Sequence, residues 1–191
     1  MFQTIGTTII TLAINAPQNS MHLMVVVTSV LMITIPTITQ MMKTMSQRQT
    51  WPTYFIKLAY TVSQRSTCSR KQVGAVIVKP NTKAVLATGY NGSLPSEPHC
   101  LDVGCFMLDK HCIRTIHAET NAINQAAQNG VSLLGAHIYC TTQPCWNCFK
   151  NIIQSGITHI YYDESYSSLN ELYAHYLSQN PHIVYEQINV N

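Results

Sequence analysis

Two short motifs constrain this chain more than any other feature. Residues 117–119 read His-Ala-Glu, and residues 144–148 read Pro-Cys-Trp-Asn-Cys. One histidine and two cysteines supply three ligands of a tetrahedral zinc site and leave its fourth position to water. Glu119, two residues after the histidine, can exchange protons with that water without occupying the metal. The fold must therefore bring both motifs to one ion.

Each motif is predicted to begin a helix, and a strand pattern over residues 136–142 lies between the two helices. His117 then lies at the N-terminus of the first helix. Cys145 and Cys148 share one face of the second helix, because residues three apart are neighbours there. The positive ends of both helix dipoles favour thiolates at this point. Zinc lowers the pKa of its bound water to about 7, so we predict a catalytic zinc site with Glu119 as proton shuttle.

Strand and helix patterns alternate along the chain from Trp51 onward. Residues 73–79 and 84–88 are predicted to form a hairpin. The other predicted elements are a helix from Trp51 to about residue 62, helices over 119–128, 145–154 and 169–177, strands over 136–142, 157–162 and 182–188, and a loop-rich insert over 91–116. This alternation indicates an α/β fold with a largely parallel sheet and helices on both faces.

Charge and cysteine content exclude some classes of protein. The formal net charge of the 191 residues is +3, which is small for a dedicated nucleic-acid binder. The chain has 7 cysteines, an odd number of which two have metal-ligand spacing. This usage argues against a disulfide framework and favours a reducing, cytoplasmic compartment.

The motifs and their surroundings resemble the deoxycytidylate (dCMP) deaminase family, within the cytidine/deoxycytidylate deaminase superfamily. The resemblance runs from about Trp51 to about Tyr166. The matching segments are residues 65–68, 73–78, 89–92, 117–123 and 154–157, together with the insert from His99-Cys100 through Cys105 to residues 111–115. The insert is similar to that of bacterial members encoded in competence operons. It separates the chain from tRNA adenosine deaminases, which lack it.

The resemblance implies a fold, a reaction and partners. The fold is a three-layer α-β-α sandwich of the cytidine deaminase type, with a mixed five-stranded sheet and helices on both faces. The reaction is the zinc-dependent hydrolysis of dCMP to dUMP and ammonia, which supplies dUMP for thymidylate synthesis. Family members are typically homohexamers that are activated by dCTP and inhibited by dTTP, so the resemblance implies a homo-oligomer with these effectors.

The resemblance also suggests residues that bind substrate. Asn91, in the Gly-Tyr-Asn-Gly segment, would contact the sugar. Arg70 is the predicted phosphate ligand, because a guanidinium suits a bidentate phosphate contact; an exposed solubilising charge is the alternative. Arg114 is a second candidate, or else a residue that orders the insert. Tyr166 matches a tyrosine near the nucleotide, although Ser167 follows it where the family often has a basic residue.

Four further cysteines form a candidate second zinc site of structural type. They are Cys68, Cys100, Cys105 and Cys112. Four thiolates can close a tetrahedral site and tie the insert to the first helix. His99 or His111 could replace one sulfur, and ordinary buried thiols are the alternative. Cys140 is expected to belong to the core.

The first residues differ from the rest, because Met1 to Met42 include no Asp, Glu, Lys or Arg. We divide the chain into an apolar extension over residues 1–44 and a zinc-dependent deaminase domain over 45–191. Translation that begins at the methionines of residues 41–45 would leave the extension outside the native fold. A membrane anchor is the alternative, although the polar residues within 21–42 argue against a spanning helix.

Other functions compete with deamination of dCMP. A base within RNA or DNA, or a free nucleoside, would keep the chemistry and change the substrate. A zinc-stabilised interaction domain would need no proton shuttle, so Glu119 argues against it. A zinc ribbon would require a second Cys-x-x-Cys, and a redox pair would leave the His-Ala-Glu motif without a purpose.

Overall fold

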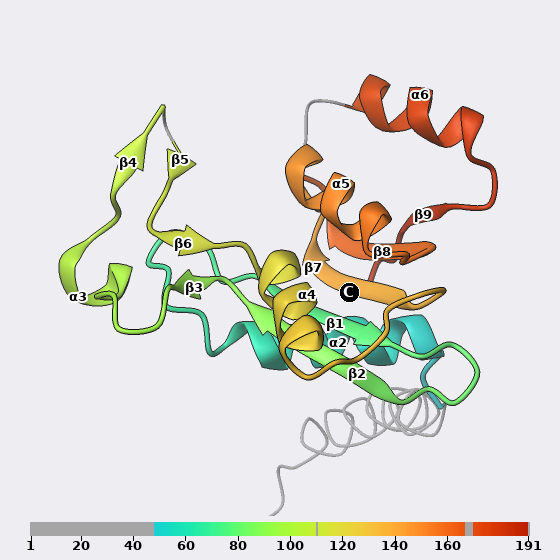
Figure 1. Ribbon diagram of the computed structural model, residues 1–191, viewed down its shortest axis with the longest axis horizontal. Coiled ribbons are helices and arrows are strands. Elements are labelled where there is room, and N and C mark those ends of the chain that lie inside the picture. Colours follow the sequence, from blue (N-terminus) through green and yellow to red (C-terminus); the bar gives the residue numbers. More distant parts are fainter. Residues whose placement is uncertain (1–47, 110, 167–169, 191) are drawn as a thin grey trace, which may run out of the picture. The chain divides into compact units, whose positions relative to one another are not determined.

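A five-stranded sheet forms the centre of the computed structural model, which describes residues 48–109, 111–166 and 170–190 (Figure 1). Its strands, in spatial order, are β2 (Val85–Tyr90), β1 (Gly74–Val78), β7 (His137–Thr142), β8 (His159–Glu164) and β9 (Val184–Gln187). β1 pairs antiparallel with β2 and with β7, whereas β7, β8 and β9 are parallel. The mixed sheet implied by the family resemblance is confirmed. The predicted hairpin is confirmed as β1–β2. The largely parallel sheet expected from alternation is wrong where β1 meets β7, because these two strands run antiparallel.

Helices cover both faces of this sheet, so the three-layer α-β-α sandwich is confirmed. They are α2 (Trp51–Ser63) on one face, α4 (Ala118–Gln128) and α5 (Trp146–Gln154) on the other, and α6 (Asn170–Gln179) near α5. Phe55 and Ile56 of α2 pack against Val76 and Tyr139. The opposite core contains Ile138 with Ala122 and Ala126 of α4 and Phe149 and Ile152 of α5. Alternate strand residues thus serve opposite layers.

The first helix begins as its sequence predicts. Thr50 is the N-cap, and its hydroxyl accepts a hydrogen bond from the backbone N–H of Thr53 at 3.4 Å. Pro52 lies in the first turn, where a missing N–H has no cost. Phe55 and Ala59 of the predicted apolar face are buried. This packing holds α2 on the sheet and fixes where the connection to β1 begins.

Two glycines allow helices to lie directly on the strands. A Cβ at Gly74 would collide with the backbone of Ala59 in α2, and a Cβ at Gly89 would collide with the backbone of Ala118 and Ala122 in α4. Only glycine permits such a close approach of helix to strand. Gly89 therefore sets the depth at which the N-terminal turn of α4 sits.

The predicted insert over 91–116 is present and contains short elements. They are β3 (Gly92–Ser93), α3 (Cys100–Val103), β4 (Met107–Leu108), β5 (His111–Cys112) and β6 (Thr115–Ile116). β3 pairs with β6 and β4 with β5, each as a two-stranded antiparallel sheet. Figure 1 shows the insert projecting from the sheet at the side where α4 begins. The insert thus reaches the N-terminus of α4, where the first motif lies.

The predictions for the apolar extension concern residues 1–44, which lie outside the described part of the chain. Ser167 lies outside it as well. Among the described residues, no helix is long and apolar enough to cross a membrane. All seven cysteines are free thiols.

Candidate active site

The three predicted zinc ligands converge between the N-termini of two helices. His117 directly precedes α4, Cys145 directly precedes α5, and Cys148 lies in the first turn of α5. The Nδ1 atom of His117 lies 3.6 Å from Sγ of Cys145 and 3.3 Å from Sγ of Cys148. A tetrahedral zinc ion with Zn–N of about 2.0 Å and Zn–S of about 2.3 Å places N and S about 3.5 Å apart. Donor type and spacing therefore fit zinc.

The two cysteines of this group differ in proton affinity. A hydrogen bond from the Cys148 thiol, together with His117, outweighs burial and lowers the pKa of Cys145 to about 4. The pKa of Cys148 is raised, first because it donates to Cys145 and then because it is buried. The pair therefore holds one negative charge by itself. A bound cation would favour the thiolate form of both.

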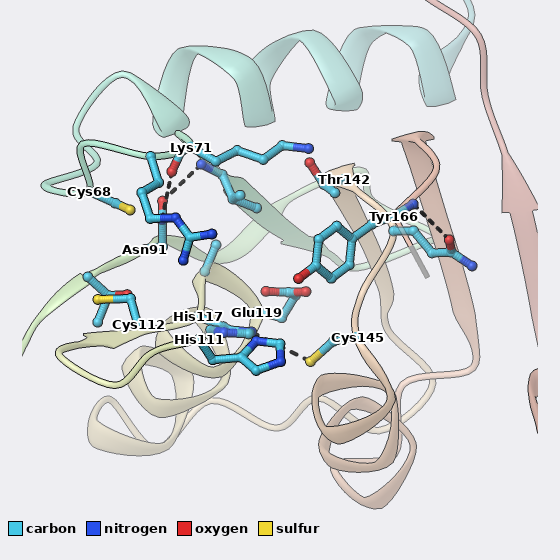
Figure 2. A pocket seen from close by; sticks show the side chains of 15 residues that line it. Cys68, Lys71, Asn91, His111, Cys112, His117, Glu119, Thr142, Cys145 and Tyr166 are labelled. Carbon is cyan, nitrogen blue, oxygen red and sulfur yellow. Dashed lines mark hydrogen bonds between the residues drawn. The ribbon is translucent and has the colours of Figure 1, made fainter. Parts of the chain in front are cut away.

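Glu119 lies in the first turn of α4, beside the metal ligands, and is only 4% exposed. Burial raises the pKa of its carboxyl to about 6, although its own backbone N–H and His117 oppose the shift. Figure 2 shows the carboxylate directed into the pocket between His117 and the ring of Tyr166. A carboxyl with a pKa near neutrality can both accept and return a proton, as the predicted shuttle requires.

These residues form one end of a cavity of about 350 Å³, within the usual size range of small-molecule sites. Its walls come from the α2–β1 connection, the insert, the start of α4, the end of β7 and the segment after β8. The lining residues are Cys68, Arg70, Lys71, Val73, Asn91, His111, Cys112, Thr115, His117, Ala118, Glu119, Thr142, Gln143, Cys145 and Tyr166. Elements distant in sequence thus meet around the proposed metal.

Asn91, the predicted sugar contact, lines the pocket and also orders its wall. Its Oδ1 accepts hydrogen bonds from the hydroxyl of Ser66 at 2.7 Å and from the N–H of Val73 at 2.9 Å. Its Nδ2 donates to the carbonyl of Lys71 at 2.8 Å. An amide nitrogen carries two hydrogens, so one remains for a ligand.

Two cationic side chains border the pocket, of which sequence reasoning found one. Arg70 is exposed, and its guanidinium lies 3.6 Å from Sδ of Met107. Lys71 was missed, because a lysine in a connection has no distinctive sequence signal; its Nζ lies 2.8 Å from Glu164 Oε2 and 5.9 Å from the centre of the Tyr166 ring. Arg114 does not line the pocket, and its backbone N–H hydrogen-bonds Cys112 in the insert.

Tyr166 lines the pocket, and the residue as a whole is 56% exposed. Its backbone N–H donates to Oε1 of Gln143 at 3.0 Å, and Nε2 of Gln143 lies 3.5 Å from Oδ1 of Asn170. Gln143 is buried. Sequence reasoning missed Thr142 and Gln143, although their place directly before Pro144 of the second motif was a usable signal.

Three of the four cysteines proposed for a second site come together. Ligand atoms of Cys100, Cys105 and Cys112 all lie within 4.8 Å of one another, and Sγ of Cys100 is 3.7 Å from Sγ of Cys112. Cys68 is not in this group; its backbone N–H donates to Ser66, and it lines the pocket. Burial and hydrogen bonding to its neighbours raise the pKa of Cys100 to about 12. Burial acts to raise the pKa of Cys112 as well, but hydrogen bonds led by that of the Arg114 N–H lower it to about 7.

Comparison with known proteins places these features in a family. Residues 49–164 match the model of the cytidine and deoxycytidylate deaminase zinc-binding region. ComE operon protein 2 of Bacillus subtilis (strain 168) is 45% identical over 145 residues, which are 76% of this chain and 75% of that protein. Deoxycytidylate deaminase of Saccharomyces cerevisiae is 38% identical over 125 residues, 62% of this chain but only 39% of that protein.

A solved structure is similar in both fold and sequence. The dCMP deaminase from the cyanophage S-TIM5, in complex with dCMP and dUMP, superposes with a TM-score of 0.59 and 31% sequence identity. The superposition covers 71% of this chain and 94% of that one. The family-model match over residues 49–164 includes His117, Cys145 and Cys148.

Proposed function

The chain belongs to the cytidine and deoxycytidylate deaminase family, and from that premise we propose that it hydrolyses dCMP to dUMP and ammonia. The cyanophage structure holds dCMP and dUMP, which are the substrate and product of this reaction. Several relatives carry the name deoxycytidylate deaminase. The product would supply dUMP for thymidylate synthesis.

One observation carries the proposal above the others. A buried carboxyl, Glu119, shares a pocket with His117 and Cys145, which together with Cys148 form a group whose spacing fits zinc. A structural zinc site is closed by four protein ligands and needs no adjacent carboxyl that exchanges protons. The arrangement is instead that of a metal site with one open position and an adjacent general acid–base.

The chain's own residues then account for the proton movements. Zinc at His117, Cys145 and Cys148 would supply the Lewis acidity that makes a water nucleophilic at neutral pH. Glu119 takes a proton from the water as its oxygen forms a bond to C4 of the cytosine, and delivers that proton to N3. It next transfers the remaining water proton to the amino group. The C4–N bond breaks, and ammonia leaves.

The cationic border supports a nucleotide over a nucleoside. Arg70 and Lys71 both line the pocket, although Glu164 already neutralises part of the charge of Lys71. A phosphate at this border would gain charge-assisted hydrogen bonds that deoxycytidine cannot form. A base within RNA or DNA would need a longer basic or aromatic surface, which a net charge of +3 does not favour.

Further parts of the proposal follow the family resemblance. The Cys100, Cys105 and Cys112 group would hold a second, structural zinc. Apolar residues exposed on the insert support a homo-oligomer, in which a second copy of the chain covers them. They are Leu94, Leu101, Val103, Phe106, Met107, Leu108 and Ile113. Regulation by dCTP and dTTP and a cytoplasmic setting complete the proposal, and the free cysteines support that setting.

An ultraviolet assay of the zinc-loaded protein tests the reaction. It should convert dCMP and leave deoxycytidine and a cytosine-containing oligonucleotide nearly unchanged. Lys71→Met should raise KM for dCMP several-fold with little change in kcat. Lys79→Met serves as control, because Lys79 follows the end of β1 and does not line the pocket. Equal turnover of deoxycytidine would contradict the nucleotide specificity. Turnover of the oligonucleotide alone would contradict the whole proposal.

A further inference from the structure

The end of β7 carries two adjacent threonines whose hydroxyl groups have different surroundings. The hydroxyl of Thr141 accepts a hydrogen bond from the backbone N–H of Gly74 at 3.2 Å. Thr142 is also buried, at 5% exposure, but within the described part of the chain its Oγ1 has no hydrogen-bond partner. Native structures seldom retain a buried hydroxyl of this kind, because the loss of its contact with water is not compensated.

The side chain of Thr142 faces the catalytic layer. Side chains alternate along a strand. Ile138 and Cys140 belong to the core on the α4–α5 side, and Tyr139 belongs to the core against α2. Thr142 has the parity of Ile138 and Cys140, so it lies on the face that carries Glu119 and the metal ligands.

The position of Thr142 is fixed from two directions. It pairs with Glu164 of β8, two residues before Tyr166, and it lies three residues before the ligand Cys145. It lines the same pocket as Glu119 and Tyr166, and Figure 2 shows it on the wall near Lys71 and Tyr166. An unpartnered hydroxyl is thus held in the pocket by the framework that also holds the metal ligands.

We propose that Thr142 is a substrate-contacting, specificity-determining residue, whose hydroxyl hydrogen-bonds the polar edge of the bound pyrimidine ring. The inference rests on the proposed deaminase function and adds a contact to it. The ring is the better partner than the phosphate, because Thr142 is buried and neutral whereas Arg70 and Lys71 are the exposed cations of the pocket. A hydroxyl can both donate and accept, which suits the mixed carbonyl and amine edge of cytosine.

Substitution of Thr142 tests the contact. Thr142→Val keeps the shape and removes the hydroxyl, and Thr142→Ser keeps the hydroxyl. With dCMP turnover by the zinc-loaded wild type established first, Thr142→Val should raise KM about 3–10-fold, with kcat within about twofold, since the net value of one hydrogen bond is modest. Calorimetry should show dUMP binding weakened by the same factor. Thr142→Ser should remain within about twofold of wild type in both measurements.

Thr141→Val provides the matched control, because it removes a neighbouring hydroxyl that is satisfied inside the protein. It should lower the melting temperature and leave KM unchanged, whereas Thr142→Val should leave the melting temperature unchanged or raise it. Unchanged dUMP affinity in Thr142→Val would overturn the inference. If wild type does not turn over dCMP, the proposed function fails, and dUMP calorimetry still decides the contact. Absence of dUMP binding to wild type would overturn the contact as well.

Discussion

At the scale of single residues, Glu119 is the group on which the proposed chemistry depends. Its carboxyl is buried beside the metal ligands, and burial holds its pKa near neutrality. The metal ligands are separate side chains, so the acid–base function can be removed without removing the metal site. Catalysis and zinc binding should therefore be separable by mutation.

Glu119→Gln should lower kcat for dCMP by about 10²–10⁴-fold, the usual contribution of general acid–base catalysis. Glutamine has nearly the same shape but cannot take a proton from water. Zinc content, measured by atomic spectroscopy, should remain that of wild type. Normal turnover by this variant would contradict the shuttle.

The residues that sequence could identify here are those inside short motifs. His117, Glu119, Cys145 and Cys148 occupy fixed spacings whose chemistry is legible without a fold. Their positions together in space follow from two helix starts, which were also predicted. Lys71 could not be found this way, because it lies in the connection between α2 and β1 and belongs to no motif, yet the fold places it at the pocket.

At the scale of elements, Gln143 joins the end of β7 to the segment that carries Tyr166. Its buried amide oxygen accepts the N–H of Tyr166, and its nitrogen faces Asn170 at the start of α6. Gln143 lines the pocket itself and also hydrogen-bonds the backbone of Tyr166, which lines another part of it. We infer a positioning effect that acts through Tyr166.

Gln143→Met should raise KM for dCMP several-fold with kcat little changed, because the Tyr166 N–H loses its acceptor while the volume is nearly kept. Gln143→Glu retains an acceptor oxygen and should recover much of the affinity. A steady-state comparison of the two variants makes the measurement. Equal KM values for wild type and Gln143→Met would rule out the positioning effect.

A pair of stacked imidazoles lies at the opposite end of the parallel strands. The ring centres of His137 and His159 are 4.0 Å apart with an interplanar angle of 15°. Burial, with His159 and Lys83 nearby, lowers the pKa of His137 to about 4, and burial also lowers the pKa of His159. Tyr161 is the other titratable ring beside them. Both histidines are therefore neutral in the folded protein at pH 7.

The unfolded chain, with histidine pKa near 6.5, binds protons between about pH 6.5 and 4 that folded His137 does not. The contribution of His137 to stability should therefore be complete above about pH 6.5 and decrease as the pH falls toward 4. Melting temperatures of wild type and His137→Gln across this range make the test. The variant should show a shallower decrease, and parallel curves would exclude the histidine pair as a cause.

Element types were predictable from sequence, but their pairing was less so. The helical patterns after residues 51, 118 and 145 and the strand patterns of β1, β7 and β8 describe local burial, which sequence records directly. Strand direction depends on how a connection crosses the sheet. The β1–β2 hairpin is local and was predicted, whereas the antiparallel β1–β7 pair appeared only in the structure.

At the scale of the whole molecule, metal ions should connect the insert and the core. The insert ends at β6, and His117 follows it immediately. The three-cysteine group of the insert and the ligand His117 therefore lie on one short stretch of chain, whereas Cys145 and Cys148 belong to α5. If zinc binds at both groups, its loss from either should affect order around the pocket.

Metal analysis should find two zinc ions per chain, and Cys105→Ser should reduce this to about one. Cys105 is the suitable site, because Cys112 also lines the pocket and Cys105 does not. Removal of zinc by a chelator should lower the melting temperature by about 5–10 °C for each ion lost, if zinc is present at about 100 times its dissociation constant. One zinc in wild type would exclude the second site.

Gly89, which does not line the pocket, affects the position of the proposed acid–base residue Glu119. The backbone of α4 rests against a position on β2 that has no side chain, and the helix carries Glu119 in its first turn. A single added methyl group at residue 89 would lift the helix away from the sheet. The carboxylate would then move relative to Cys145 and Cys148, which are held by a different helix. The absence of a side chain at residue 89 thus keeps Glu119 in its position relative to the zinc ligands.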